Sequence, residues 1–213
     1  MSEVIVETRD LSIRFGGVLA VNNVNFSLRA REMRCLIGPN GAGKSTFFKC
    51  LTGQHKINSS NGYVFIDGHD VTGWQPYEIV QLGVGIKTQV PSVMNGLTVW
   101  ENLWLSARRI HGKQGASAEV DRVITELGLQ SHLRRVVGEL AHGQRQIVEI
   151  GLVLCQRPKL VLLDEPAAGI TGAEADRLVE LIKGINQQAA VIVVDHDMNF
   201  VRMLGGAVTV LHQ

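Results

Sequence analysis

The chain has 213 residues, of which 45% are hydrophobic and 19% are charged. This length and composition are those of one globular domain with a core of its own, which excludes an intrinsically disordered protein. With 21 basic and 20 acidic residues the net charge is +1, so the overall charge gives no reason to expect binding to nucleic acid or to an anionic membrane.

The N-terminal third is typical of short antiparallel strands around one helix. We expect strands at residues 4–7, 11–15, 24–28, 33–37 and 62–66, the last of them ending at the turn formed by Asp67 and Gly68. Residues 44–52 form the expected helix, which Gly53 ends as a C-terminal cap.

The middle of the chain is helical in pattern. Val99, Leu103 and Ala107 recur at a spacing of four, and helix continues in the prediction to about residue 140, with a polar break at 112–115. We therefore expect residues 90–155 to be a helical subdomain, inserted into a core made of residues 1–89 and 156–213.

The last third returns to strands. Residues 160–163 and 191–194 are continuous apolar strands, joined by a helix at about 173–185. Such strands imply a parallel sheet that is covered on both faces, and so an α/β fold.

The cysteines and the N-terminus bear on the compartment. Cys35, Cys50 and Cys155 lie far apart in apolar segments without metal-ligand spacing, which favours reduced core thiols in a cytosolic protein. We see no signal peptide, and the longest apolar runs, of about seven residues, fall short of the ~18 needed to span a bilayer. If the protein works at a membrane, another chain supplies the spans.

A glycine-rich segment between an apolar strand and a helix has the pattern of a phosphate-binding loop. Its residues are Gly38, Pro39, Asn40, Gly41, Ala42, Gly43, Lys44, Ser45 and Thr46. Glycines allow successive N–H groups to face phosphate oxygens, and the start of the helix adds its positive end. We expect Lys44 to contact the β- and γ-phosphates, Ser45 to bind Mg²⁺ and Thr46 to contact the α-phosphate. The alternative is a chance glycine turn before a helix.

Two acids follow the apolar strand at 160–163. Asp164 ends the strand, where ligands of open α/β sheets bind, and is a candidate Mg²⁺ carboxylate. Glu165 comes next and is a candidate to orient and deprotonate the attacking water. The alternatives are a turn-forming acid for Asp164 and a solvated acid for Glu165.

The strand at 191–194 ends in Asp195, His196 and Asp197. A histidine at this place can reach a γ-phosphate. The alternative is a helix start, because both aspartates are good N-caps.

Taken together, these sites resemble those of the ATP-binding cassette (ABC) ATPases, the motor subunits of ABC transporters. The segment Leu140-Ala141-His142-Gly143-Gln144, about twenty residues before Asp164, looks like the family's signature and separates it from kinases and GTPases. The resemblance runs from about residue 4 to the end. It implies a P-loop NTPase core with a mixed sheet, an inserted helical subdomain, and ATP and Mg²⁺ as ligands.

Further roles come from the resemblance alone. It implies that the signature, with the Gly143 N–H, binds the γ-phosphate of the opposite protomer. Gln89 would sense Mg²⁺ and the transport subunit, although by itself it looks like loop filler. His196 matches the switch histidine. Phe15 falls where an aromatic ring stacks on adenine, with Val21 beside the ribose, although Phe15 alone could equally be core.

Three positions depart from the family pattern. Ala141 replaces the usual serine, which removes a hydroxyl from the γ-phosphate, and we expect a working but slower site. His142 replaces the usual glycine. Thr171 stands where many members carry an aspartate that contacts the opposite protomer.

These departures resemble the sequences of the ATPase subunits of urea and branched-chain amino-acid importers. The segments at 32–35 and 208–213 look most like the urea-type subunit. We therefore expect the ATPase of a urea importer on the cytoplasmic face of the inner membrane. Its expected partners are permease subunits, a second ATPase and a periplasmic solute-binding protein. We expect the second ATPase to be a different chain, and a second copy of this chain is the alternative. The chain stops after what should be a late strand, so we expect that it is truncated relative to the family.

Other interpretations stay open. The motor could serve a branched-chain amino-acid importer, or the chain could be a soluble ABC ATPase, although such proteins usually carry a coiled-coil insertion or a second cassette. A module that binds ATP but barely hydrolyses it is a third alternative, because of Ala141. Trp100, Leu103 and Trp104 are candidates for the core of the helical subdomain or for a groove that receives the transporter.

Overall fold

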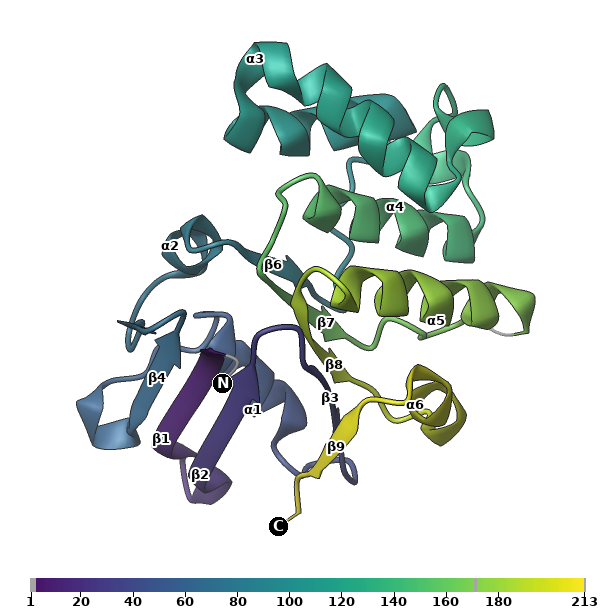
Figure 1. Ribbon diagram of the computed structural model, residues 1–213. Coiled ribbons are helices and arrows are strands. Elements are labelled where there is room, and N and C mark those ends of the chain that lie inside the picture. The colour runs from purple at the N-terminus through teal and green to yellow at the C-terminus, as the bar shows by residue number, and fades with distance from the viewer. Residues whose placement is uncertain (1–2, 171, 213) are drawn as a thin grey trace.

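A computed structural model describes residues 3–170 and 172–212 (Figure 1). Nine strands form two sheets in these ranges. The antiparallel sheet has the order β2-β1-β4-β5 and contains β1 (Val4–Phe15), β2 (Val18–Arg29), β4 (Tyr63–Ile66) and β5 (His69–Asp70). The parallel sheet has the order β6-β7-β8-β3-β9 and contains β3 (Met33–Ile37), β6 (Val84–Lys87), β7 (Leu160–Asp164), β8 (Ala190–Val194) and β9 (Ala207–Val210). The predicted fold class is confirmed, with the two kinds of strand in separate sheets.

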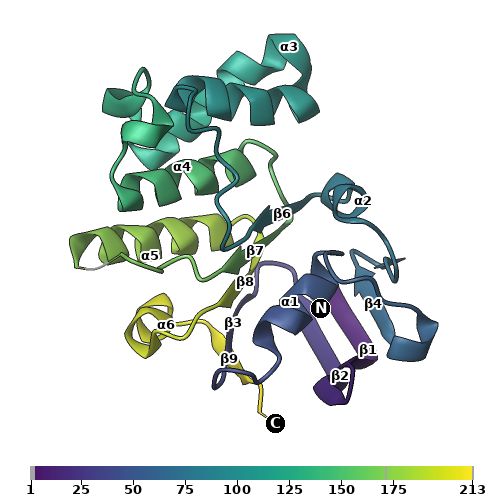
Figure 2. The same cartoon turned by 180° about the vertical axis from the view of Figure 1, so that it is seen from behind.

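The parallel sheet is covered on both faces, as its continuous apolar strands predicted (Figures 1 and 2). Leu160 and Leu162 of β7 pack with the antiparallel sheet and with helices α1 (Lys44–Leu51) and α2 (Pro76–Gln81). Val161 and Leu163 face the other way, toward α4 (His142–Leu154), α5 (Ala173–Asn186) and α6 (Met198–Leu204). Helices α1 and α4, which begin at the phosphate loop and at the signature-like segment, thus lie on opposite faces of one sheet.

Strand β1 corrects one prediction. Residues 4–7 and 11–15 belong to one strand, not two. Its pairing with β2 shifts register between Thr8 and Leu11, and Asp10 has a φ of 51° in the left-handed region. One extra residue of β1 is accommodated here as a bulge, which bends the strand without ending it. The interruption in the hydrophobic alternation was therefore a bulge and not a turn.

Helix α3 (Val99–Leu127) supplies most of the helical layer. Thr98 caps its start by accepting the Glu101 N–H, and Glu101 bonds back to Thr98 in a capping box. The predicted break at 112–115 is narrower in the structure, since Gly112 alone is non-helical, with φ 66° and ψ −178°. The predicted helix to residue 140 is also too long: α3 ends at Leu127, and Gln130–His132 and Val137–Glu139 are single 3₁₀ turns.

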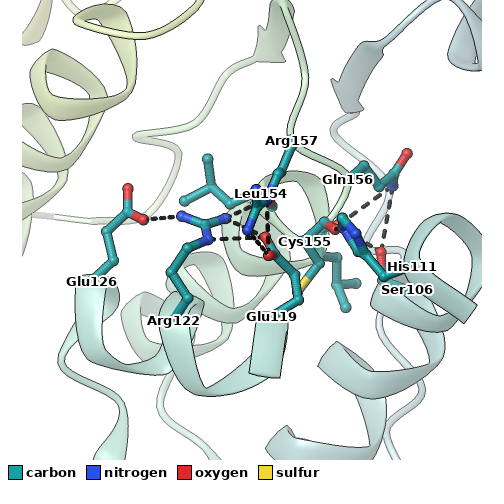
Figure 3. Close-up of polar contacts among 10 residues, drawn as sticks. Ser106, His111, Glu119, Arg122, Glu126, Leu154, Cys155, Gln156 and Arg157 are labelled. Atoms are coloured by element: carbon teal, nitrogen blue, oxygen red, sulfur yellow. Dashed lines mark hydrogen bonds and ion pairs between the residues drawn. The ribbon is translucent and has the colours of Figure 1, made fainter. Parts of the chain in front are cut away.

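Gly112 divides α3 into a first arm, residues 99–111, and a second arm, residues 113–127, and both arms contact the end of α4 (Figure 3). From the first arm, Ser106 donates to the Leu152 carbonyl at 2.6 Å and the His111 Nε2 lies 2.9 Å from the Cys155 carbonyl. From the second arm, Arg122 donates to the Leu154 carbonyl at 3.1 Å. These side chains satisfy carbonyls that a helix end leaves without partners.

A buried glutamate organises the second arm. The carboxylate of Glu119, whose side chain is 2% exposed, accepts from Arg122 Nε and from Arg157 Nε at 2.9 Å each (Figure 3). Burial acts to raise the pKa of this carboxyl, but the two guanidinium groups outweigh it and the pKa is lowered. Arg157 lies in the link between α4 and β7, so its ion pair with Glu119 also joins the helical layer to the sheet.

The remaining predictions concern the membrane and the cysteines. No helix within residues 3–170 or 172–212 is long and apolar enough to cross a bilayer. The three cysteines are buried and free, and burial raises the pKa of the Cys50 and Cys155 thiols to about 12.

Candidate functional site

The phosphate loop lies between β3 and α1, as predicted. Lys44 is 8% exposed, and its Nζ donates to the carbonyls of Gly38 at 2.6 Å and Pro39 at 3.0 Å, so the lysine closes the loop from within. Gly43, the N-cap of α1, has a φ of 86°. A Cβ there would lie 2.0 Å from the Ala20 carbonyl oxygen, so the loop requires glycine at this position. The first N–H groups of a helix have no partner within the helix, and no side chain of the described residues caps the start of α1, so these groups can bind an anion.

The other predicted loop residues differ in exposure. Asn40, Gly41 and Ser45 are exposed, Thr46 is half-buried and Ala42 is buried. An exposed Ser45 hydroxyl, one residue after the lysine, is accessible to a metal ion that accompanies a phosphate.

The carboxyl ends of β7 and β8 bring Glu165 and His196 together. The strands pair up to Asp164 and Val194, and the next N–H, that of Glu165, donates to the Val194 carbonyl at 2.8 Å. His196 Nδ1 then lies 3.6 Å from Glu165 Oε1. Glu165 has a φ of 46°, which a non-glycine residue keeps only where its surroundings hold it. Such strain is common at functional sites.

Asp195 is a residue that the sequence analysis treated only as a helix cap. Its Oδ1 accepts the N–H groups of His196 at 2.8 Å and Asp197 at 2.9 Å. Asp197 is the actual cap of α6, accepting from Asn199 and Phe200. The helix start and the placement of His196 beside Glu165 are thus both present. The sequence signal for the role of Asp195 was an acidic residue directly after an apolar strand.

Asp164 has the properties of a cation ligand. It is 6% exposed, and its Oδ1 has no hydrogen-bond partner. Burial, followed by the charge of Glu165, raises its pKa to about 6, although Lys87 and Lys49 oppose the rise. A buried carboxylate oxygen without a partner is costly, and a metal ion would remove that cost. Asp164 and the accessible Ser45 hydroxyl therefore fit Mg²⁺, a cation that takes oxygen ligands.

We expect Asp164→Asn to stabilise the nucleotide-free protein by about 1–3 kcal/mol at about pH 7.5, while abolishing activity. The folded-state pKa lies above the unfolded value, so ionisation of Asp164 lowers stability as the pH rises from about 4 to 6 and the full loss persists above that range. The amide cannot ionise. Urea denaturation should therefore show a gain that shrinks by more than half at about pH 4.5.

Asp121→Asn, on the exposed face of α3, is the matched control and should change stability little at either pH. A gain at Asp164 that is independent of pH would contradict the electrostatic explanation.

Phe15 is 48% exposed at the turn between β1 and β2. Its ring meets that of His55 edge to face, with centroids 5.0 Å apart. The sequence analysis did not single out His55, because nothing in the sequence indicates that it reaches residue 15. Val21 is buried, and its side chain lies beside Gly43.

Gln89 and the signature-like segment are positioned by other elements, β6 and α4. Gln89 is exposed, two residues after the end of β6. Ala141 is the N-cap residue of α4 and bears only a methyl group, and the Ala141 N–H donates to Gln144 Oε1 at 3.3 Å. His142 and Gly143 contact residues of the segment 168–174 of the same chain. Thr171 lies outside the described residues.

Lys87 is another residue that the sequence analysis missed. Its Nζ lies 3.3 Å from Glu149 Oε2 of α4, and both side chains are at most 3% exposed. A lysine in an otherwise apolar strand was the only signal in the sequence.

Comparison with known proteins decides the family. The family model described as "ABC transporter" matches residues 21–168. The chain belongs to the ABC transporter family. As a member it is an ATP-binding, ATP-hydrolysing enzyme.

Its relatives include the high-affinity branched-chain amino acid transport ATP-binding proteins BraF of Pseudomonas aeruginosa and LivG of Escherichia coli K12. The identities are 32% and 34%, and each alignment covers all of this chain and 90% of the relative. Among solved structures, MJ1267, an ATP-binding cassette of an ABC transporter, superposes with a TM-score of 0.88 at 26% identity, covering 100% of this chain and 88% of that one.

Proposed function

We propose that this chain is the ATP-hydrolysing subunit of an importer for branched-chain amino acids. The full-length similarity to BraF and LivG carries this choice of solute. The resemblance to urea-type subunits rests on short segments, so urea becomes the alternative and not the first expectation.

The site supports a division of labour for hydrolysis. The loop from Gly38 to Thr46 holds the phosphates, with the Lys44 ammonium at its centre. Glu165 takes a proton from the attacking water, and His196, 3.6 Å away, orients that carboxylate and the γ-phosphate. Phe15 receives the adenine on its exposed face, with Val21 beside the ribose. Mg²⁺, held by Asp164 and Ser45 with Gln89 nearby, would neutralise charge on the phosphates.

The placement of α1 and α4 on opposite faces of the sheet supports a second ATPase as partner. Because the phosphate loop and the signature begin helices on opposite faces, we assign them to two different nucleotide sites. We propose that residues 141–144 complete the site of the partner, which is a different ATPase or a second copy of this chain. The division into a core of residues 1–89 and 156–213 and a helical subdomain of residues 90–155 belongs to this proposal.

The membrane-spanning part of the importer would be permease subunits, with a periplasmic protein that captures the solute. A hollow of about 290 Å³ between β6, α3 and the end of α4, lined by Met94, Leu105 and Gln156 among others, is the surface that we assign to the permease. Leu103 is buried in the core beneath it, and Trp100 and Trp104 stack with centroids 6.0 Å apart. The chain would therefore work at the cytoplasmic face of the inner membrane.

Uptake of labelled leucine and labelled urea tests this function in cells whose own copy carries Lys44→Ala. We expect leucine uptake to fall and urea uptake to hold. The matched control is Lys183→Ala, which removes a lysine from the exposed face of α5. A fall in urea uptake alone would restore the urea interpretation, and unchanged uptake of both solutes with the variant protein present would reject both.

A further inference from the structure

The conformation of Glu165 depends on a short turn formed by residues 165–168, called here the Glu165 turn. The φ of 46° is unfavourable for glutamate, so neighbouring contacts must impose it. On one side the Glu165 N–H donates to the Val194 carbonyl at 2.8 Å. On the other side the Glu165 carbonyl accepts the Ala168 N–H at 3.2 Å. The direction of the carboxylate is thus set by how this turn is held.

Two side chains from other elements lie against the far half of the turn. The Ala167 N–H lies near the carboxyl of Asp195, at the end of β8. Burial raises the pKa of that carboxyl, and the Ala167 N–H acts to lower it. His142, in the first turn of α4, places its Nε2 2.8 Å from the Ala168 carbonyl oxygen. A carbonyl can only accept, so Nε2 carries the proton and donates it.

The imidazole also packs closely on the residue that follows the turn. A Cβ at Gly169, which has a φ of 73°, would lie 3.2 Å from His142 Nε2 and 3.3 Å from its Cδ2. Ala168 and Gly169 are both exposed. The His142 ring therefore supplies packing that a buried turn would receive from the protein core. One residue further along α4, a Cβ at Gly143 would lie 2.5 Å from the Glu174 carboxylate. The start of α4 therefore packs closely against Ala168, Gly169 and Glu174.

We propose that His142 is a positioning residue for Glu165. Its hydrogen bond fixes the Glu165 turn and, through it, the carboxylate that takes the proton from water. A shift of the first turn of α4 would pull on Ala168 and disturb Glu165 in the same chain. The inference rests on the proposed role of Glu165.

The test compares His142→Gln with His142→Met in steady-state hydrolysis of ATP by the full chain. Glutamine places an N–H donor as many bonds from Cα as the histidine Nε2, whereas methionine has similar length and good helix propensity but no donor. We expect kcat of the methionine variant to be about fivefold below that of the glutamine variant, with KM for ATP within about twofold between them. His142→Gly should resemble the methionine variant.

Equal kcat for the glutamine and methionine variants would overturn the proposal, since the hydrogen bond would then not matter. A loss confined to KM would also overturn it, because the ring would then act on nucleotide binding. Thermal unfolding of each variant separates both results from a damaged fold. Hydrolysis by Glu165→Gln, measured alongside, separates the role of Glu165 from the role of His142. If that variant hydrolyses ATP as fast as the wild type, the proposed role of Glu165 is wrong, and the inference about His142 is wrong with it.

Discussion

Glu165→Gln is expected to lower kcat for ATP hydrolysis by about 10²- to 10⁴-fold while leaving the affinity for ATP nearly unchanged. The amide has the shape of the carboxylate but cannot accept a proton from water. The strained backbone of Glu165 and its bond to Val194 concern the main chain, so the substitution leaves them in place. The amide keeps an oxygen that can stay beside His196, although it removes the negative charge of the carboxylate. Phosphate release and equilibrium binding of ATP measure the two quantities separately.

Glu180→Gln is the matched control for that experiment. It makes the same chemical change on the exposed face of α5, where Glu180 has an ion pair with Lys183 at 3.3 Å. Surface pairs of this kind contribute little, so we expect wild-type hydrolysis. If Glu165→Gln keeps kcat within about threefold of the wild type, another group must activate the water.

The parts of the site that could be predicted from the sequence are those encoded by neighbouring residues. The glycines and the lysine of the phosphate loop all lie within residues 38–44, and Asp164 directly ends an apolar strand. Local patterns of this kind predict the geometry of the site, because the same few neighbouring residues determine the strand, the loop and the helix.

What could not be predicted joins residues far apart in the chain. His142 and Ala168 are 26 positions apart, and the contact depends on how α4 docks on the sheet. The same holds for Phe15 with His55 and for Lys87 with Glu149. The short elements α2 and β6 were missed because six and four residues give too little periodicity to identify.

The buried pair of Lys87 and Glu149 gives the second large expected effect. Both side chains are at most 3% exposed, so removing one partner leaves a buried charge uncompensated. We expect Lys87→Met to lower the free energy of unfolding by about 3–5 kcal/mol. The double variant Lys87→Met/Glu149→Leu should recover most of this loss, because apolar residues of similar volume replace a buried pair at little cost. Urea denaturation of the single and double variants forms the cycle that measures the coupling.

Recovery of stability should not restore function fully, because Lys87 has a second electrostatic effect. Its charge holds down the pKa of Asp164, which burial and Glu165 have already raised to about 6. Without the lysine that pKa rises further, so a larger fraction of Asp164 is protonated near neutral pH and cannot bind a cation. The double variant should therefore be stable yet slow at about pH 7, and should regain activity relative to the wild type at about pH 8.5. Slow hydrolysis that persists at the higher pH would show instead that the pair acts by holding α4 against β6.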